Sequence, residues 1–260
     1  MLIDGQAPTE GDHHHLALVN YGAYTSFRIE DGGVRGLDRH LARLDGYAVE
    51  LFGEPVGEDR LRDFLRTAVG DRMDGWLRVS LFSPEIWPRT PSARVRPRVL
   101  TVMSPPPPPL ATAVRLQVRT YAREQAHIKH TATFGLIHAR RMAREAGFDD
   151  ALFTDAEGLI SEGPSWNVGF LAADTVVWPQ APMLAGVTQS LIQAHLAGVG
   201  LSGVTEPVTV ADLGRFDGAF LCNSATPACA VTAIGDRMFA PDDRLARLAA
   251  AWSASPLQAL

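Results

Sequence analysis

The sequence predicts an α+β protein built in two parts. Runs with helical spacing of apolar residues and runs of strand type follow one another in both halves of the 260 residues. Five consecutive prolines at 105–109 separate the halves, because such a run can form neither a helix interior nor a central strand. We therefore expect an N-terminal domain at 1–104, a proline-rich linker at 105–110 and a C-terminal domain at 111–260.

Two helices and two strands are expected before the prolines. Leu37, Leu41, Leu44 and Val49 recur at helical spacing among charged residues, which is typical of a helix with one buried face. The expected elements are helices at 36–51 and 61–68 and strands at 76–82 and 95–103.

A similar mixture is expected after the prolines. Gly147 follows a helical run and suits the left-handed position that ends a helix. An apolar run at 151–154, a turn at 155–158 and a second short run at 159–160 predict a hairpin. The other expected elements are strands at 114–118 and 166–171, helices at 136–146 and 186–196, and a strand with an irregular turn within 220–231.

Charge and composition exclude several classes of partner. Lys and Arg total 24 against 29 Asp and Glu, so the formal charge of −5 gives no general attraction to nucleic acid or to an anionic membrane. No apolar run approaches the ~20 residues of a membrane span, and the start lacks a basic and apolar leader. We therefore expect a cytoplasmic protein.

No metal site is expected. His13, His14 and His15 are adjacent, and adjacent residues of a strand point to opposite faces, so they do not converge easily on one ion. A solvated or loop run of histidines is the expected arrangement. Cys222 and Cys229 lie in an apolar segment and are expected to be reduced thiols rather than a disulfide or a metal pair.

Lys129 is the most informative single residue, because it lies within an apolar stretch at 128–137. Burial disfavours the charged form of an amine. A neutral amine can attack a carbonyl group and form a Schiff base, which is a chemical reason to tolerate such a position. The alternative is a structural lysine at the start of a helix, with its stem buried and its ammonium in solvent.

The order of features after Lys129 decides between these interpretations. A helix, a hairpin, the pattern Glu162-Gly-x-x-x-Asn167 and the Gly-Val-Thr of 186–188 follow it in turn. Taken alone, Glu162 could be a solvated carboxylate at a strand end. Together with the run His-Leu-Ala-Arg-Leu at 40–44, however, the order resembles the fold-type IV pyridoxal-phosphate enzymes over nearly the whole chain. These are the branched-chain and D-amino acid aminotransferases and aminodeoxychorismate lyase.

The resemblance implies a small N-terminal α/β domain and a larger C-terminal α/β pseudo-barrel domain, with pyridoxal 5'-phosphate as the cofactor and a homodimer as the assembly. It implies that Lys129 is the Schiff-base lysine and that Glu162 faces the pyridine nitrogen of the cofactor. An adjacent carboxylate keeps that nitrogen protonated, so that the ring can accept electrons from the substrate α-carbon.

The resemblance also implies a set of phosphate ligands. Arg43 matches the family's phosphate-binding arginine, whose fork of donors suits a dianion. Val187 and Thr188 stand where the phosphate meets a helix N-terminus, although Thr188 could also be only a cap. Asn223 and Ser224 align with the family's other turn on the phosphate side.

Three residues are expected near the substrate. Tyr24 lies where the family places a bulky pocket residue, and Arg78 matches a position that binds the substrate carboxylate in some members. Arg78 could equally be paired structurally, as half-buried strand arginines often are. Phe134 stands where the aminotransferases usually carry a tyrosine, and the lyase lacks that tyrosine too.

The predicted function is that of a pyridoxal-phosphate aminotransferase, which moves an amino group between an amino acid or amine and a keto acid through Lys129. The alternative is a lyase of the aminodeoxychorismate lyase type, which releases pyruvate by β-elimination. A remote third hypothesis is a non-catalytic protein that binds pyridoxal phosphate. Retention of Lys129, Glu162 and Arg43 together argues against it, since such a protein has little chemical reason to keep all three.

Overall fold

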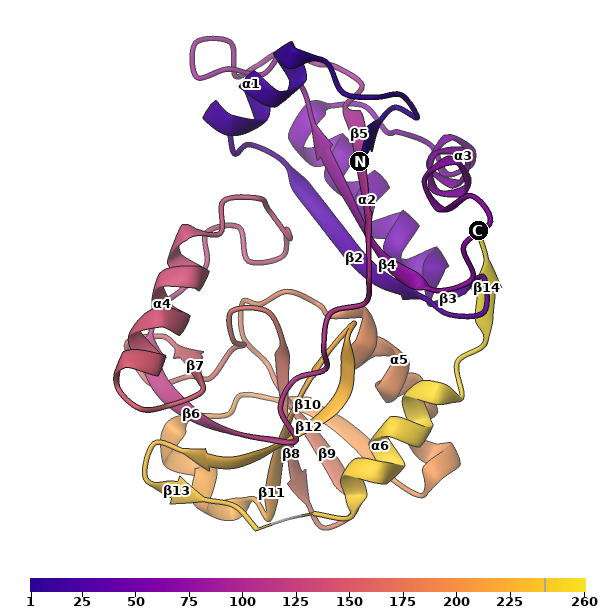
Figure 1. The fold of residues 1–260 in the computed structure, drawn as a ribbon. Helices are drawn as coiled ribbons and strands as arrows, with labels where there is room; N and C mark the ends of the chain where they lie inside the picture. Colours follow the sequence, from indigo (N-terminus) through magenta and orange to yellow (C-terminus); the bar gives the residue numbers. More distant parts are fainter. Residues whose placement is uncertain (241) are drawn as a thin grey trace. The chain divides into compact units, whose positions relative to one another are not determined.

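A computed structural model describes residues 1–240 and 242–260 of the chain, which are drawn in Figure 1. These residues form two compact units. Unit 1 consists of Met1–Pro107, Ile128–Ala132 and Pro256–Leu260, and unit 2 consists of Pro108–His127 and Thr133–Ser255. Two segments that follow the prolines in the sequence, one of them around Lys129, therefore pack with the N-terminal elements.

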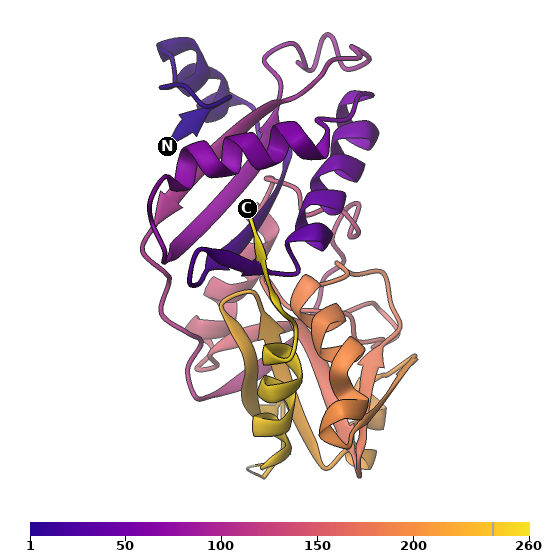
Figure 2. The ribbon, with the colours of Figure 1, turned by 90° about the vertical axis from the view of Figure 1, so that its right-hand side faces the viewer.

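Unit 1 is an antiparallel sheet with helices packed against it. Its elements are β1 (Leu2–Ile3), α1 (Glu10–Leu18), β2 (Ala23–Ile29), β3 (Gly33–Arg35), α2 (Leu37–Phe52), α3 (Glu58–Val69), β4 (Gly75–Phe82), β5 (Arg98–Ser104) and β14 (Leu257–Ala259). Among the described residues, four strands form one sheet in the order β1-β5-β4-β2, with every neighbouring pair antiparallel. Helix α2 packs on β2 and α3 packs on β5 (Figure 2), while β3 pairs with β14.

Helix α2 shows how the sequence pattern becomes packing. Leu37, Leu41 and Leu44 lie on the predicted buried face, and none is more than 2% exposed, whereas Val49 of the same predicted set is 50% exposed. Burial of each of these leucine side chains contributes roughly 1.5–3 kcal/mol. Gly53, with a φ of +84°, ends the helix in the left-handed conformation that glycine adopts without steric cost. The expected helix at 36–51 is therefore confirmed.

Strand β2 was not among the expected elements. Its buried residues alternate along the strand, so Thr25, Phe27 and Ile29 face the core while Tyr24 and Arg28 are less buried. The alternation of Phe27 and Ile29 with charged neighbours was a signal for this strand. The expected strands at 76–82 and 95–103 are observed as β4 and β5, with small shifts of their ends.

The histidine run lies in helix α1 and not in a loop, and two of its three members are solvated as expected while His15 is not. Thr9 and Asp12 form a capping box that starts the helix. Successive residues of a helix point in different directions, so His13 and His14 are exposed while His15 is only 3% exposed. The His15 ring lies 5.2 Å from the Trp87 ring, with the two ring planes close to perpendicular.

Unit 2 is a larger mixed sheet with three α-helices. Its elements are β6 (Ala113–Thr120), α4 (Phe134–Glu145), β7 (Asp150–Thr154), β8 (Asn167–Ala172), β9 (Thr175–Pro179), α5 (Val187–His195), η1 (Leu196–Val199), β10 (Ser202–Glu206), η2 (Val210–Arg215), β11 (Gly218–Asn223), β12 (Thr226–Ile234), β13 (Arg237–Met238) and α6 (Arg244–Ser253). The strand order over the described ranges is β10-β9-β8-β11-β12-β6-β7, and β13 pairs with β12. The pairs β6–β7, β6–β12 and β9–β10 are parallel and the other pairs are antiparallel.

The predicted elements of unit 2 are present. The helix expected at 136–146 is α4, and Gly147 follows it with a φ of +83°. The predicted hairpin follows β7, where Thr154 and Ile160 form an antiparallel bridge. Elements β9, β10 and α6 were not expected from the sequence.

Some classes of feature are absent from the described parts of the chain. No helix within 1–240 or 242–260 is long and apolar enough to span a membrane. The same residues contain no group of three or more His, Cys, Asp or Glu side chains placed to hold a metal ion. Cys222 and Cys229 are buried free thiols, as the sequence predicted.

Candidate active-site residues

The backbone around Lys129 is fixed to the start of β2. The Tyr24 N–H donates to the carbonyl of Lys129 at 2.8 Å, and the Thr131 N–H donates to the carbonyl of Gly22 at 2.9 Å. Ala23 and His130 form the antiparallel bridge between these two hydrogen bonds. Ile128 is 2% exposed and belongs to the hydrophobic core of unit 1, whereas Lys129 is half-buried rather than fully enclosed.

Two predicted substrate residues lie beside Lys129 within unit 1. Its Nζ is 5.0 Å from the centroid of the Tyr24 ring, and the guanidinium of Arg78 lies over the same ring at 3.6 Å. Unit 1 thus places the Arg78 guanidinium and Lys129 Nζ near the same Tyr24 ring.

Helix α2 contributes Arg43 and a buried histidine. His40 Nδ1 and Thr25 Oγ1 are 2.6 Å apart, and both residues are almost completely buried. Burial lowers the pKa of His40 to about 3, and the positive charges of Arg43 and Lys129 act in the same direction. Burial also lowers the pKa of the half-buried Arg43, while nearby Tyr47 acts to raise it. His40 was quoted in the sequence pattern but given no role.

Glu162 is a buried, ion-paired carboxylate. Glu162 is 4% exposed, and its Oε1 accepts hydrogen bonds from Arg123 Nη1 at 3.0 Å and from the Leu184 N–H at 3.2 Å. The Arg123 side chain is itself only 5% exposed. The alternative of a solvated carboxylate at a strand end is therefore wrong. Arg123 was not predicted to pair with Glu162, because the sequence carries no signal for a contact between residues 39 positions apart.

The N-terminus of α5 is closely packed against Asn167. The Asn167 Nδ2 donates to the carbonyl of Leu184 at 2.8 Å, and a Cβ on Gly186 would come within 2.0 Å of Asn167 Oδ1. Val187 and Thr188 form the first turn of the helix and are 5% and 4% exposed. Unpaired amides at a helix N-terminus are suited to an anion, and only glycine allows this close approach at 186.

The turn between β11 and β12 holds Asn223 and Ser224. The Asn223 Oδ1 accepts the N–H groups of Ala225 and Thr226 at 3.0 and 2.9 Å, so this side chain stabilises the turn. Ser224 lies at the tip of the turn and is half-buried. Because its Oδ1 is used within the turn, Asn223 would bind a ligand through its side-chain amide nitrogen or its backbone.

Phe134 lies at the first position of α4 and is 81% exposed. Its ring stacks on that of His138, one turn later, at 5.7 Å with an interplanar angle of 9°.

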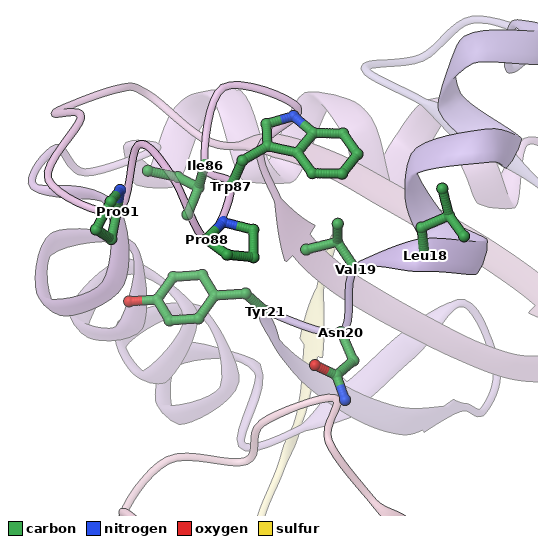
Figure 3. Close-up of a pocket in the computed structure, with 8 residues that line it drawn as sticks. All are labelled: Leu18, Val19, Asn20, Tyr21, Ile86, Trp87, Pro88 and Pro91. Atoms are coloured by element: carbon green, nitrogen blue, oxygen red, sulfur yellow. The ribbon is translucent and has the colours of Figure 1, made fainter.

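An apolar cavity of about 320 Å³ also lies in unit 1 (Figure 3). Its walls come from the end of α1, the chain that leads into β2 and the loop after β4. The lining residues are Leu18, Val19, Asn20, Tyr21, Ile86, Trp87, Pro88 and Pro91. No predicted site residue is among them.

The residues present fit pyridoxal phosphate. The cofactor needs an amine, a carboxylate for its ring nitrogen and donors for its phosphate. Unit 1 provides an amine on a fixed backbone and a half-buried arginine. Unit 2 provides a buried carboxylate held by a guanidinium and a helix N-terminus with a glycine in close contact.

Comparison with known proteins supports the same conclusion. The sequence model of the amino-transferase class IV family matches residues 22–234. Among curated proteins, the "Putative branched-chain-amino-acid aminotransferase" of Methanocaldococcus jannaschii is 24% identical over 239 residues, which cover 86% of this chain and 82% of that protein.

Solved structures share the fold. A hypothetical aminotransferase from Mycobacterium tuberculosis, in its PLP-bound form, superposes with a TM-score of 0.76 at 20% identity, covering 93% of this chain and 90% of that one. A structure from Legionella pneumophila named "Putative 4-amino-4-deoxychorismate lyase" gives a TM-score of 0.81 at 19% identity, with 97% of both chains covered. These similarities confirm the predicted fold class.

The family match runs from the residue before β2 to the end of β12 and so includes most of both units. The predictions of an enzyme, of pyridoxal phosphate as its cofactor and of aminotransferase activity are confirmed with it. The chain belongs to the class IV aminotransferase family of pyridoxal-phosphate-dependent enzymes.

Proposed function

We propose that the enzyme moves an amino group between an amino acid or amine and a keto acid, with Lys129 as the residue that binds the cofactor and moves the proton. One observation carries this assignment. Lys129 is the only lysine among the 260 residues, and its backbone is hydrogen-bonded into the edge of β2. The chain therefore has a single side-chain amine for Schiff-base chemistry.

When bound, pyridoxal phosphate supplies an aldehyde that takes up an amine and a cationic ring that accepts electrons. Lys129 Nζ would hold the cofactor until the amine of a substrate takes its place. Nζ would then take the proton from the substrate α-carbon and return it to the cofactor. A half-buried position on a fixed backbone suits both tasks, because it restricts the motion of the amine.

The Glu162 carboxylate is proposed to accept a hydrogen bond from the protonated ring nitrogen of the cofactor. This carboxylate is buried, and the guanidinium of Arg123 at 3.0 Å favours the charged form. A charged carboxylate in turn keeps a proton on the ring nitrogen. Arg123 is thus proposed as the residue that positions Glu162 for this contact.

The phosphate is proposed to bind Arg43, the N–H groups and hydroxyl of Val187 and Thr188, and the turn at Asn223 and Ser224. Arg43 offers a planar fork of donors. The buried first turn of α5 offers N–H groups that have no partner within their own helix.

Tyr24, Arg78 and Phe134 are proposed as substrate-pocket residues. The position of the Tyr24 ring, near both Lys129 Nζ and the Arg78 guanidinium, supports two of them. Phe134 also favours a second candidate function, a lyase of the aminodeoxychorismate type, because it lacks the tyrosine hydroxyl usual in the aminotransferases. A lyase would use the same residues up to loss of the α-proton and would need no keto acid.

The assembly is proposed to be a homodimer in the cytoplasm. Phe134 and Ile137 lie one helical turn apart on α4 and are 81% and 66% exposed, an apolar pair that a second subunit could cover. The two free thiols suit a reducing compartment. Light scattering coupled to gel filtration measures the mass directly.

The test of the proposed function uses the single lysine. The parent protein and the Lys129→Ala and Lys129→Arg variants are incubated with pyridoxal phosphate, reduced with borohydride and digested for mass spectrometry. We expect the parent to show a visible absorbance band and, after reduction, an adduct on Lys129. We expect the variants to show neither the band nor an adduct at residue 129. No surface lysine exists that could give false labelling.

A second step separates the two reactions. An amino donor added without keto acid should bleach the band, and a keto acid should restore it, if the enzyme transfers amino groups. Release of pyruvate from aminodeoxychorismate with a persistent band would assign the lyase instead. A parent protein with no adduct on Lys129 would refute both.

A further inference from the structure

Lys129 shares one aromatic ring with an arginine. The Nζ of Lys129 lies 5.0 Å from the centroid of the Tyr24 ring, and the Cζ of Arg78 lies 3.6 Å from the same centroid. All three residues belong to unit 1. Because the distances share one centroid, the two cationic groups are no further apart than their sum, 8.6 Å.

Strands β2 and β4 hold this arrangement in place. Tyr24 is paired with Ser80 and Ser26 is paired with Arg78, so Arg78 is the diagonal neighbour of Tyr24 on one face of the sheet. Arg78 Nε also lies 3.4 Å from Ser80 Oγ, within hydrogen-bonding distance. The backbone hydrogen bond from Tyr24 to the carbonyl of Lys129 sets the lysine beside the same ring.

Arg78 occupies the stronger position on the ring. A cation gains most from an aromatic face at close range, and the gain fades near 6 Å. Arg78 is in direct contact at 3.6 Å, whereas Lys129 is near the outer part of that range at 5.0 Å. The arginine also stays charged at every pH of interest, so its charge opposes a second positive charge on Lys129.

Helix α2 also contributes ionisable groups near Lys129 within unit 1. His40 interacts electrostatically with both Lys129 and Arg43, and it is neutral near pH 7 because its pKa is about 3. The ionisable groups of β2, β4 and α2 near Lys129 therefore include Tyr24, Arg78 and His40, and Arg43 is a further positive charge beside His40.

We propose that Arg78, in contact with the Tyr24 ring, is a positioning residue that disfavours protonation of Lys129 and so raises the fraction of its amine that is uncharged at a given pH. The proton leaves to water, and no co-reactant is needed. The use of this amine by the cofactor rests on the proposed function above. The repulsion between Arg78 and Lys129 does not rest on the proposed function, because both groups are present in the cofactor-free chain.

The size of the effect follows from the distance. Two unit charges 8.6 Å apart, at an effective dielectric constant of ~20, repel by an amount equivalent to roughly one to one and a half pKa units. A shorter separation or a drier environment would enlarge the shift, and added salt would reduce it.

The experiment reads the protonation of Lys129 directly. Cofactor-free protein labelled with ¹³C-lysine should give one lysine Cε signal, since the chain has one lysine. Its chemical shift is followed as a function of pH at low ionic strength in the parent and in Arg78→Gln. We expect the midpoint to rise by about one pH unit in the variant.

Two matched variants serve as controls. Arg28→Gln removes an arginine of the neighbouring strand β2, one that is exposed and paired with Asp74 at 3.0 Å, and should leave the midpoint unchanged. Tyr24→Phe keeps the ring and removes only the hydroxyl, so it should also leave the midpoint near that of the parent. An Arg78→Gln midpoint no higher than that of Arg28→Gln would overturn the proposal, as would an equal rise in Tyr24→Phe.

A measurement on the parent protein covers the case in which Arg78→Gln does not fold. Raising the ionic strength should raise the midpoint of the single Cε signal, because salt screens the repulsion; a midpoint that falls or stays constant would contradict the proposal. Borohydride labelling of Lys129 is scored separately. Its failure would count against the proposed function and leave the electrostatic result standing.

Discussion

Acid should weaken unit 1 through His40. The imidazole is 2% exposed, is 2.6 Å from Thr25 Oγ1 and has a pKa of about 3, against 6.5 for a free histidine. The folded state therefore prefers the neutral ring, while the unfolded chain takes up a proton below pH 6.5. Stability from this group is fully present above the unfolded pKa and is lost as the pH falls from 6.5 toward 3.

The magnitude follows from proton linkage. Each pH unit below 6.5 costs about 1.4 kcal/mol until the folded pKa is reached. Lowering the pH from 8 to 5 should thus reduce the free energy of unfolding by about 2 kcal/mol through His40 alone. His15 adds to this loss, since burial lowers its pKa as well.

Urea unfolding of the parent and of His40→Gln at a series of pH values measures the effect. The variant loses the titrating group, so its unfolding free energy should fall less steeply between pH 6.5 and 5, although its stability at pH 8 will be lower. His14→Gln is the matched control, because His14 is exposed on α1 and should leave the slope as in the parent. Equal slopes in His40→Gln and the parent would refute the linkage, as would a His40 ring signal that titrates near pH 6 by NMR.

Two further predictions concern unit 2. Arg123→Met leaves the buried Glu162 carboxylate without its ion pair and should lower the free energy of unfolding by about 3 kcal/mol. The double variant with Glu162→Gln should recover part of that loss, and additive losses in a double-mutant cycle would contradict the coupling. Gly186→Ala places a Cβ within 2.0 Å of Asn167 Oδ1 and should cost about 1–3 kcal/mol and weaken binding of pyridoxal phosphate. Gly46→Ala is the control within helix α2, where a Cβ has open space and should be neutral or stabilising; an equal loss of cofactor affinity in both variants would refute the role given to Gly186.

Local patterns predicted several of the regular elements and missed others. Helices α2 and α4 and strands β4 and β5 follow from the spacing of apolar residues, because one buried face is enough to define each of them. Strand β2 was missed since Tyr24, Thr25 and Ser26 dilute its alternation. The helical conformation of the histidine run in α1 was not predicted, because the run was analysed with the periodicity of a strand. The capping box of Thr9 and Asp12 starts a helix there instead.

The site was predictable only where the residue type is itself informative. Lys129 stands out as an amine in an apolar segment, and Glu162 is marked by the pattern that follows it. Their partners carry no such mark. No signal in the sequence links Arg123 to Glu162, and their contact appears only in the folded chain, where Arg123 Nη1 lies 3.0 Å from Glu162 Oε1.

The segment around Lys129 makes the same point about long-range structure. It follows the prolines by about twenty residues in sequence, yet residues 128–132 pack with unit 1 through hydrogen bonds to the start of β2. The expected division of the chain at the prolines did not predict this packing. A proline run excludes a helix at its own position, but it gives no information about which strand a later segment will join. The pairing matters for chemistry, since it is what places the only lysine beside Tyr24 and Arg78. The reactivity of that amine is therefore expected to depend on tertiary contacts that no local pattern encodes.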